Sequence, residues 1–181
     1  LALQQYDLAI TQFNQSLKIE KSSNNKLGLA INYHNIGYAQ EALGKLDDAV
    51  TNYKKSLSYN NAINSEIGRV ICYNSLGGIY LKKENYEDAE PIIKEALEKA
   101  LKLDDQFYIA SSYINLGQLE LALGKVSSAK ENLETALKIS KTYNLKSSVA
   151  ESSKLLSKIN QLDQDFKAAL DYYKKAVEIE N

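Results

Sequence analysis

The side chains that could support catalysis or bind a metal are few in this chain. His34 is the single histidine and Cys72 the single cysteine among 181 residues. A nucleophile and its general base must come within about 3 Å of each other, and a protein metal site needs three or four ligands. Nothing in the sequence completes either arrangement around His34 and Cys72. We therefore expect no enzyme activity, no bound metal and no cofactor.

Amide and ammonium groups are the other candidates for contact with a partner. Asn35 and Asn115 each carry a carboxamide, which both donates and accepts hydrogen bonds and can pair with the backbone of an extended peptide. The alternative is that each carboxamide satisfies a neighbouring helix. Lys154 and Lys158 lie one helical turn apart and could hold an acidic group, or could simply form a solvated helix face.

Charge and composition narrow the classes of partner. Lys and Arg total 22 while Asp and Glu total 23, so the formal net charge is −1. This balance gives no electrostatic footprint for nucleic acid or for an anionic membrane. No apolar run reaches the roughly 18 residues that a bilayer span requires. A lone cysteine permits no internal disulfide, and this favours a reducing compartment such as the cytoplasm.

The elements that position these groups follow from a repeat of 40 residues. One alanine column holds Ala9, Ala49, Ala89, Ala129 and Ala169. A glycine column holds Gly37, Gly77 and Gly117, with Ser157 in the fourth place. Columns in a single register predict a repeat array. We divide it into a half repeat over 1–26 and repeats over 27–66, 67–106, 107–146 and 147–181.

Each repeat is predicted to contain two helices. The first places Ala30, Tyr33, Ile36 and Gly37 on one helical face. A short break follows, as at Gly44, where glycine ends a helix. With 1 Pro and 8 Gly, the composition favours helix throughout. The sequence predicts an all-α fold of paired helices, with about nine helices in total.

These columns resemble the tetratricopeptide repeat. The resemblance implies a right-handed α-solenoid of antiparallel helix pairs. The matching residues of the first repeat are Tyr33, Ile36, Gly37, Ala49, Tyr53 and Ser56, and those of the second are Tyr73, Leu76, Gly77, Tyr80, Ala89, Ile93 and Ala96. The fourth repeat departs from the pattern, because Ser153 replaces the bulky residue and Ser157 the glycine. The period exceeds the usual value of about 34. This long form resembles the repeats of peptide-sensing bacterial regulators and of Leu-Gly-Asn scaffold proteins.

The resemblance implies where partners bind and what the chain does. In this family the first helix of each repeat lines the concave surface, where partners bind. The concave-face residues implied here are His34, Asn35, Tyr38, Asn74, Asn115, Gln118, Lys154 and Lys158. We expect a non-catalytic module that binds a protein or peptide segment, as the sensor or scaffold region of a larger bacterial signalling protein.

The ends of the array suggest an alternative. The sequence begins and ends with a helix that matches the second helix of a repeat. Each of these helices lacks an outer partner, so we expect apolar side chains to be exposed at both ends. The residues concerned are Leu1, Leu3, Phe13, Phe166, Leu170 and Tyr173. Head-to-tail contact between such ends can build open assemblies. The alternative expectation is therefore a structural module that self-associates through its repeat ends.

Most of the 13 tyrosines fall on packing columns, so we expect no base-stacking surface.

Overall fold

The computed structural model describes residues 2–180, with side chains from residue 4 to residue 179. The chain divides into two compact units, Leu1–Asn85 and Tyr86–Asn181. We call these the N-terminal unit and the C-terminal unit. Over the described residues the structure contains nine helices and no strand, which confirms the all-α prediction.

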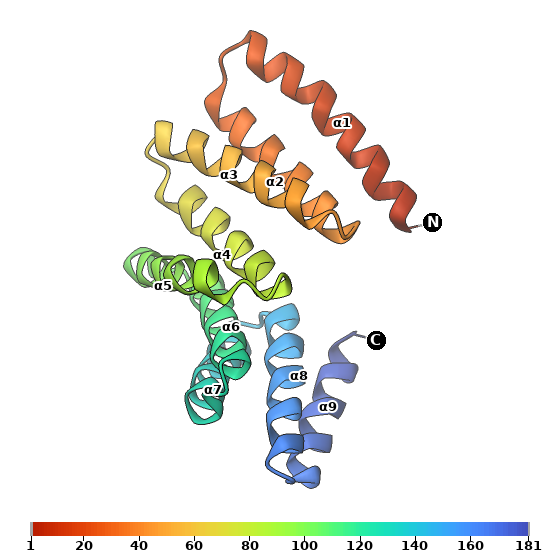
Figure 1. Ribbon diagram of the computed structural model, residues 1–181, viewed down its shortest axis with the longest axis vertical. Coiled ribbons are helices and arrows are strands. Elements are labelled where there is room, and N and C mark those ends of the chain that lie inside the picture. The colour runs from red at the N-terminus through yellow and green to blue at the C-terminus, as the bar shows by residue number, and fades with distance from the viewer. Residues whose placement is uncertain (1, 181) are drawn as a thin grey trace. The chain divides into compact units, whose positions relative to one another are not determined.

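The N-terminal unit consists of four helices in sequence (Figure 1). They are α1 (Ala2–Ser22), α2 (Lys26–Ala42), α3 (Leu46–Ala62) and α4 (Glu66–Lys82). Each packs against the next along the chain, and α2 also contacts α4. The core between α1 and α2 contains Leu17, Leu29, Tyr33 and Ile36, flanked by Phe13 and Tyr59. The apolar columns of the repeat thus form the core of this unit.

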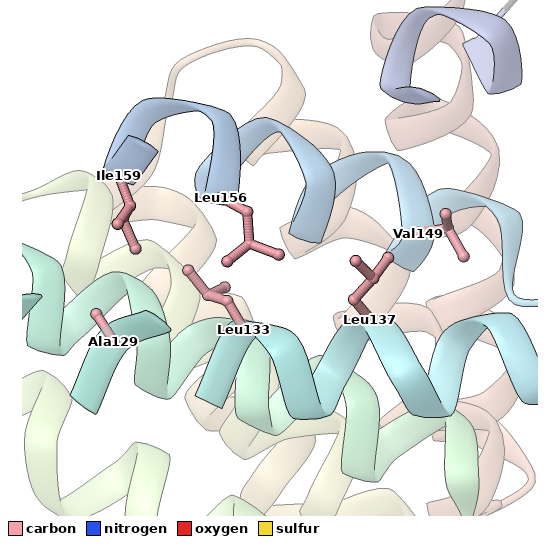
Figure 2. Packing of buried hydrophobic residues seen from close by; sticks show 6 residues of the cluster. All are labelled: Ala129, Leu133, Leu137, Val149, Leu156 and Ile159. Atoms are coloured by element: carbon pink, nitrogen blue, oxygen red, sulfur yellow. The ribbon is translucent and has the colours of Figure 1, made fainter. Parts of the chain in front are cut away.

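The C-terminal unit consists of the remaining five helices. They are α5 (Tyr86–Leu103), α6 (Gln106–Ala122), α7 (Val126–Thr142), α8 (Lys146–Leu162) and α9 (Phe166–Glu180). Figure 2 shows its core, where Leu133 and Leu137 of α7 point toward Leu156 and Val149 of α8. Neighbouring helices along the chain pack together here as well, and α6 contacts α8.

Short connections with one recurring conformation join the helices. A residue with positive φ follows every helix from α1 to α8, at Asn24, Gly44, Asn64, Glu84, Asp104, Gly124, Asn144 and Gln164. This left-handed residue turns the chain at a helix C-terminus, and it suits glycine and asparagine best. Side-chain caps begin α2, α4 and α6, where Asn25, Ser65 and Asp105 accept backbone N–H groups.

Small residues allow α2 and α3 to approach closely. A Cβ placed on Gly37 would lie 2.8 Å from the Tyr53 ring and 3.3 Å from the carbonyl oxygen of Ala49. Ala49 and Tyr53 are both completely buried. The same contact recurs in the C-terminal unit, where a Cβ on Gly117 would lie 2.6 Å from Leu133 Cγ. The glycine column is therefore a packing requirement.

Candidate peptide-binding surface

One side of α2 is open to solvent and carries both apolar and amide side chains. Leu27, Ile31, Asn35 and Tyr38 follow one another at helical spacing on this side, which we call the open face of α2. The exposed fraction is 53% for Leu27, 51% for Ile31 and 59% for Tyr38. A row of exposed apolar groups on one helix face is typical of an interaction surface.

The Asn35 carboxamide has no hydrogen-bond partner in the described part of the chain. Its side chain is half-buried and forms no hydrogen bond with any other residue that the structure describes. The alternative expectation, that this carboxamide hydrogen-bonds to a neighbouring helix, is therefore not what the structure shows. Asn115 of α6 differs, because it already interacts with another residue of the chain. The two asparagines are not equivalent, although they occupy matching positions of the repeat.

A half-buried carboxylate, that of Glu41, forms a polar cluster with two partners beside the open face of α2. Glu41 of α2 accepts a hydrogen bond of 2.8 Å from the Tyr53 hydroxyl of α3 and pairs with Lys82 of α4 at 2.5 Å. Burial and the Glu41 charge raise the pKa of Tyr53 far above its ordinary value. Three helices of the N-terminal unit thus meet at one carboxylate. The corresponding pairs are Leu121 and Leu133 in the third repeat and Gln161 and Tyr173 in the fourth, so the pairing of a glutamate with a tyrosine is particular to the first repeat.

His34 lies beside this cluster in its neutral form. Its ring is 5.0 Å from the Tyr53 ring, centroid to centroid, and tilted by 40°. The Nδ1 atom is buried and has no hydrogen-bond partner among the described residues. Burial lowers the pKa of His34, and the Glu41 charge only partly opposes this. A neutral, packed imidazole supports the shape of the surface rather than acting as an exposed ligand.

The neighbouring helix α4 extends the surface within the N-terminal unit. Asn74 is half-buried and interacts with another residue of the chain. Lys82 is exposed and reaches back to Glu41 of α2. Ile67 is exposed at the position that matches Leu27 in the repeat. Sequence reasoning missed the apolar positions Leu27, Ile31 and Ile67, although the 40-residue spacing between Leu27 and Ile67 could have revealed part of this surface.

In the C-terminal unit the predicted residues lie on α6 and α8. Gln118 of α6 donates a hydrogen bond of 3.1 Å to Glu151 of α8. A pocket of about 620 Å³ lies beside Glu151 and Lys154, and its other lining residues are Lys146, Ser147, Ala150 and Ile179. Lys158 is exposed and does not line this pocket. Of the predicted residues of this unit, Lys154 is in the lining of this pocket.

The apolar residues predicted at the ends have different surroundings. Phe166, Leu170 and Tyr173 form an exposed stripe along α9, and each is more than half exposed. Phe13 is half-buried against the core of the N-terminal unit, so little of it is free for a second copy. Leu1 and the side chain of Leu3 lie outside the described residues.

Cys72 belongs to a buried polar network. Asn60 Nδ2 lies 3.5 Å from its sulfur, and the sulfur lies 3.3 Å from Ser56 Oγ. Burial raises the pKa of the Cys72 thiol, which disfavours the reactive thiolate. Asn32 takes the equivalent place on α2 and donates a hydrogen bond of 2.9 Å to Ser16. These contacts give Cys72 a packing role. Among the described residues, no three His, Cys, Asp or Glu side chains gather as metal ligands would.

Comparison with known proteins agrees with this architecture. The tetratricopeptide repeat profile matches residues 1–61 and 69–142, which is more than half of the chain. The chain belongs to the tetratricopeptide repeat family. No curated protein sequence matches the chain.

Several solved structures share the fold. A Rap protein complexed with Competence and Sporulation Factor has a TM-score of 0.86 at 18% identity, over 97% of this chain and 49% of that one. BtubC from P. vanneervenii has a TM-score of 0.69 at 25% identity, over 86% and 65%. MamA has a TM-score of 0.60 at 22% identity, over 97% and 88%.

This chain spans about half the length of the Rap protein that it matches. At these identities the likeness to the Rap protein and to MamA concerns the fold. None of the helices that the structure describes is both long and apolar enough to cross a membrane.

Proposed function

We propose that the N-terminal unit binds an extended peptide segment along the open face of α2 and the adjacent part of α4. The observation that carries this proposal is the free Asn35 carboxamide between the exposed side chains of Ile31 and Tyr38. An amide that both donates and accepts can hold a peptide backbone, while flanking apolar groups cover the peptide's side chains. Rigid helices preorganise both kinds of contact.

The solved relatives support peptide or protein recognition as the general role. The Rap structure is complexed with Competence and Sporulation Factor. The proposal transfers only the general role to this chain, since the identity is 18%. In the C-terminal unit, Asn115, Gln118, Lys154 and Lys158 offer a separate set of polar groups, in which Lys154 borders the pocket.

Selection from a library of random peptides displayed on phage tests the proposal. The affinity of an enriched peptide is then measured by fluorescence anisotropy for the wild type and for variants. Asn35→Ala is expected to weaken binding by about five- to tenfold, because a hydrogen bond contributes about 1 kcal/mol net. Tyr38→Ala is expected to weaken it more, since aromatic anchors dominate binding energies.

Matched controls come from exposed residues elsewhere. Asn61 of α3 and Tyr143 at the end of α7 are both exposed and lie on other elements. Asn61→Ala and Tyr143→Ala should leave the affinity unchanged. Enrichment of no peptide, or equal losses in these controls, would contradict the proposal.

We further propose that the chain is the sensor or scaffold region of a larger bacterial signalling protein. The 40-residue period and the Rap-like fold support this role. Sequencing the reading frame on both sides of this chain tests it directly. An adjoining kinase, DNA-binding or other signalling domain is expected. A reading frame that contains only the present residues would contradict the proposal.

A second candidate function rests on α9. Phe166, Leu170 and Tyr173 are exposed on α9. Leu133, which matches Tyr173 in the preceding repeat, is instead completely buried in the core that α7 forms with α8. An apolar stripe of this kind can pair with a second copy and support self-assembly. Light scattering over a range of concentrations tests this, with Leu170→Lys as the variant. Mass that rises with concentration in the wild type, and not in the variant, favours assembly.

A further inference from the structure

A pocket open to solvent lies between α8 and α9, which pack side by side in the C-terminal unit (Figure 1). We call it the α8–α9 pocket. Its volume of about 620 Å³ falls in the range of about 300–1,000 Å³ that ligand sites occupy. Lys146, Ala150 and Lys154 line it at four-residue spacing, so they form one row along α8. Ile179 lines it from α9.

The lining combines an apolar middle with cationic ends. Ala150 is only 5% exposed, and Ile179 is half-buried and packs against the core of this unit. Lys146 and Lys154 are exposed on either side of Ala150. A lysine carries its ammonium group on a long aliphatic stem, so each lysine adds apolar surface as well as charge. A ligand of this pocket therefore meets apolar surface at the centre of the row and a cation at each end.

Positive charge exceeds negative charge in the lining, which contains two lysines and one acid, Glu151. Glu151 accepts the hydrogen bond of 3.1 Å from Gln118 of α6. Glu151 and Lys154 each also have a further interaction within the chain. Lys146 forms no ion pair with any residue that the structure describes, and the first turn of α8 contains no acidic residue. Lys146 is thus the cation that gains most from an added carboxylate.

The pair of lysines is particular to the fourth repeat. The matching pairs in the three preceding repeats are Lys26 and His34, Glu66 and Asn74, and Gln106 and Ile114. In the third repeat Ile114 is 3% exposed and belongs to the core. Lys154 therefore places an exposed cation where the preceding repeat has a buried apolar side chain. Packing within the repeat does not explain a lysine at this position, whereas a negatively charged ligand does.

The spacing of the row matches an extended peptide. Lys146 and Lys154 are eight residues apart, which is about 12 Å along α8. An extended chain rises about 3.3 Å per residue and points alternate side chains to one side, so its residues i, i+2 and i+4 span about 13 Å. We propose that the α8–α9 pocket binds an extended acidic peptide segment, with Asp or Glu at i and i+4 and an aliphatic residue at i+2. The carboxylates pair with the two lysines, and the aliphatic side chain covers Ala150 and Ile179.

An acidic peptide suits this lining better than a basic segment or a small anion. Both lysines repel a basic segment. A small oxyanion pairs with the cations but covers none of the apolar surface of Ala150 and Ile179. Glu151 repels a carboxylate at the centre of the row, which favours an aliphatic residue there. This site lies on α8 and α9, whereas the peptide-binding proposal above concerns α2 and α4. Either proposal can therefore fail while the other stands.

NMR titration of the full chain with the peptide Gly-Glu-Ser-Leu-Ser-Glu-Gly, blocked at both termini, tests the site. Saturable shifts in the amide signals of residues 146, 150, 154 and 179 are expected. Lys146→Gln should weaken binding about two- to fivefold, as the loss of one exposed ion pair does. Lys158→Gln is the matched control, because Lys158 is exposed on the same helix but does not line the pocket. It should leave the affinity unchanged.

Changes in the peptide separate its charged contacts from its apolar contact. Glutamine at both acidic positions should weaken binding about fivefold or more, because both ion pairs are lost. Serine at the central position should weaken it about tenfold, because the apolar contact with Ala150 and Ile179 is lost. Tyr38→Ala, on the open face of α2, should leave the shifts of residues 146, 150, 154 and 179 unchanged. Circular dichroism verifies that each variant is folded.

Four results would overturn the proposal. Shifts that do not saturate would show that the pocket does not bind the peptide. Equal losses in Lys146→Gln and Lys158→Gln would make the attraction a general effect of charge. Saturation by acetate at the same concentration as by the peptide would mean that the pocket holds a small anion only. Loss of the shifts in Tyr38→Ala would assign the peptide to the open face of α2.

Discussion

Two buried serines of α8 differ in whether their hydroxyl groups form hydrogen bonds. Ser152 is completely buried and its hydroxyl has no partner among the described residues. Ser157 is also buried, but its hydroxyl donates a hydrogen bond of 2.7 Å to the carbonyl oxygen of Ala169 on α9. A buried hydroxyl without a partner loses its hydration and gains nothing in return. The cost of burial therefore differs between two side chains of the same chemistry.

Ser152→Ala is expected to raise the free energy of unfolding by about 1 kcal/mol, because it removes an unsatisfied polar group. The matched control, Ser157→Ala, should lower it by about 1 kcal/mol, because it removes an interhelical hydrogen bond. Urea denaturation of both variants measures the difference. Equal changes in the two variants would show that the hydroxyl environments are alike.

His34 makes the stability of the N-terminal unit depend on pH. Burial holds the pKa of folded His34 below its ordinary value of 6.5. The unfolded chain therefore binds more protons than the folded chain at acidic pH, and stability falls as pH falls through about 6.5. Urea midpoints measured between about pH 7.5 and pH 5.5 should decline, and His34→Gln should flatten the decline. A decline of equal size in His34→Gln would assign it to carboxylates instead.

At the scale of the helix, close approach and helix ends determine the fold. Gly37 and Gly117 allow α2 to meet α3 and α6 to meet α7. Positive-φ residues recur between successive helices and reverse the chain. The sequence predicted the helix end at Gly44, and the same residue type stands at Gly124. It did not predict the left-handed conformation of Glu84 and Gln164, because their types do not favour it.

Gly37→Ala should destabilise the chain by about 1–3 kcal/mol, since the new Cβ would overlap the buried Tyr53 ring. Gly28→Ala is the matched control on the same helix. Its Cβ would meet only the carboxyl end of Glu20, which can swing away. The control should therefore be neutral or slightly stabilising, because alanine favours helix over glycine. Thermal unfolding of both variants provides the measurement, and a Gly37→Ala melt at the wild-type temperature would contradict the packing argument.

Gln164→Gly tests the helix ends. Gln164 connects α8 to α9 with a φ of 61°, which costs about 1 kcal/mol or more in a residue with a Cβ. Glycine adopts this conformation freely, as Gly124 does with a φ of 75°. The variant should gain about 1 kcal/mol in the free energy of unfolding, and Gly124→Gln should lose a similar amount. Calorimetry that finds the opposite signs would rule out this account of the connections.

At the scale of the whole molecule, the repeat explains more of the fold than of the binding surface. The core columns, which contain Tyr33, Ala49 and Leu133, could be predicted from the sequence because packing restricts these positions to few residue types. Surface positions such as Leu27 and Ile31 carry no such restriction, so their role required the exposure seen in the structure. The free state of Asn35 also depended on which side chains lie nearby, and the matching Asn115 shows that sequence position alone does not determine it.

The central claim is that the open face of α2 binds peptide. NMR chemical-shift mapping with a selected peptide tests it most directly, because every described helix reports at once. The expected result is a footprint on Leu27, Ile31, Asn35 and Tyr38, with smaller changes on α4. A footprint on the α9 stripe around Leu170, with no change on α2, would contradict the claim and favour recognition through the exposed repeat end.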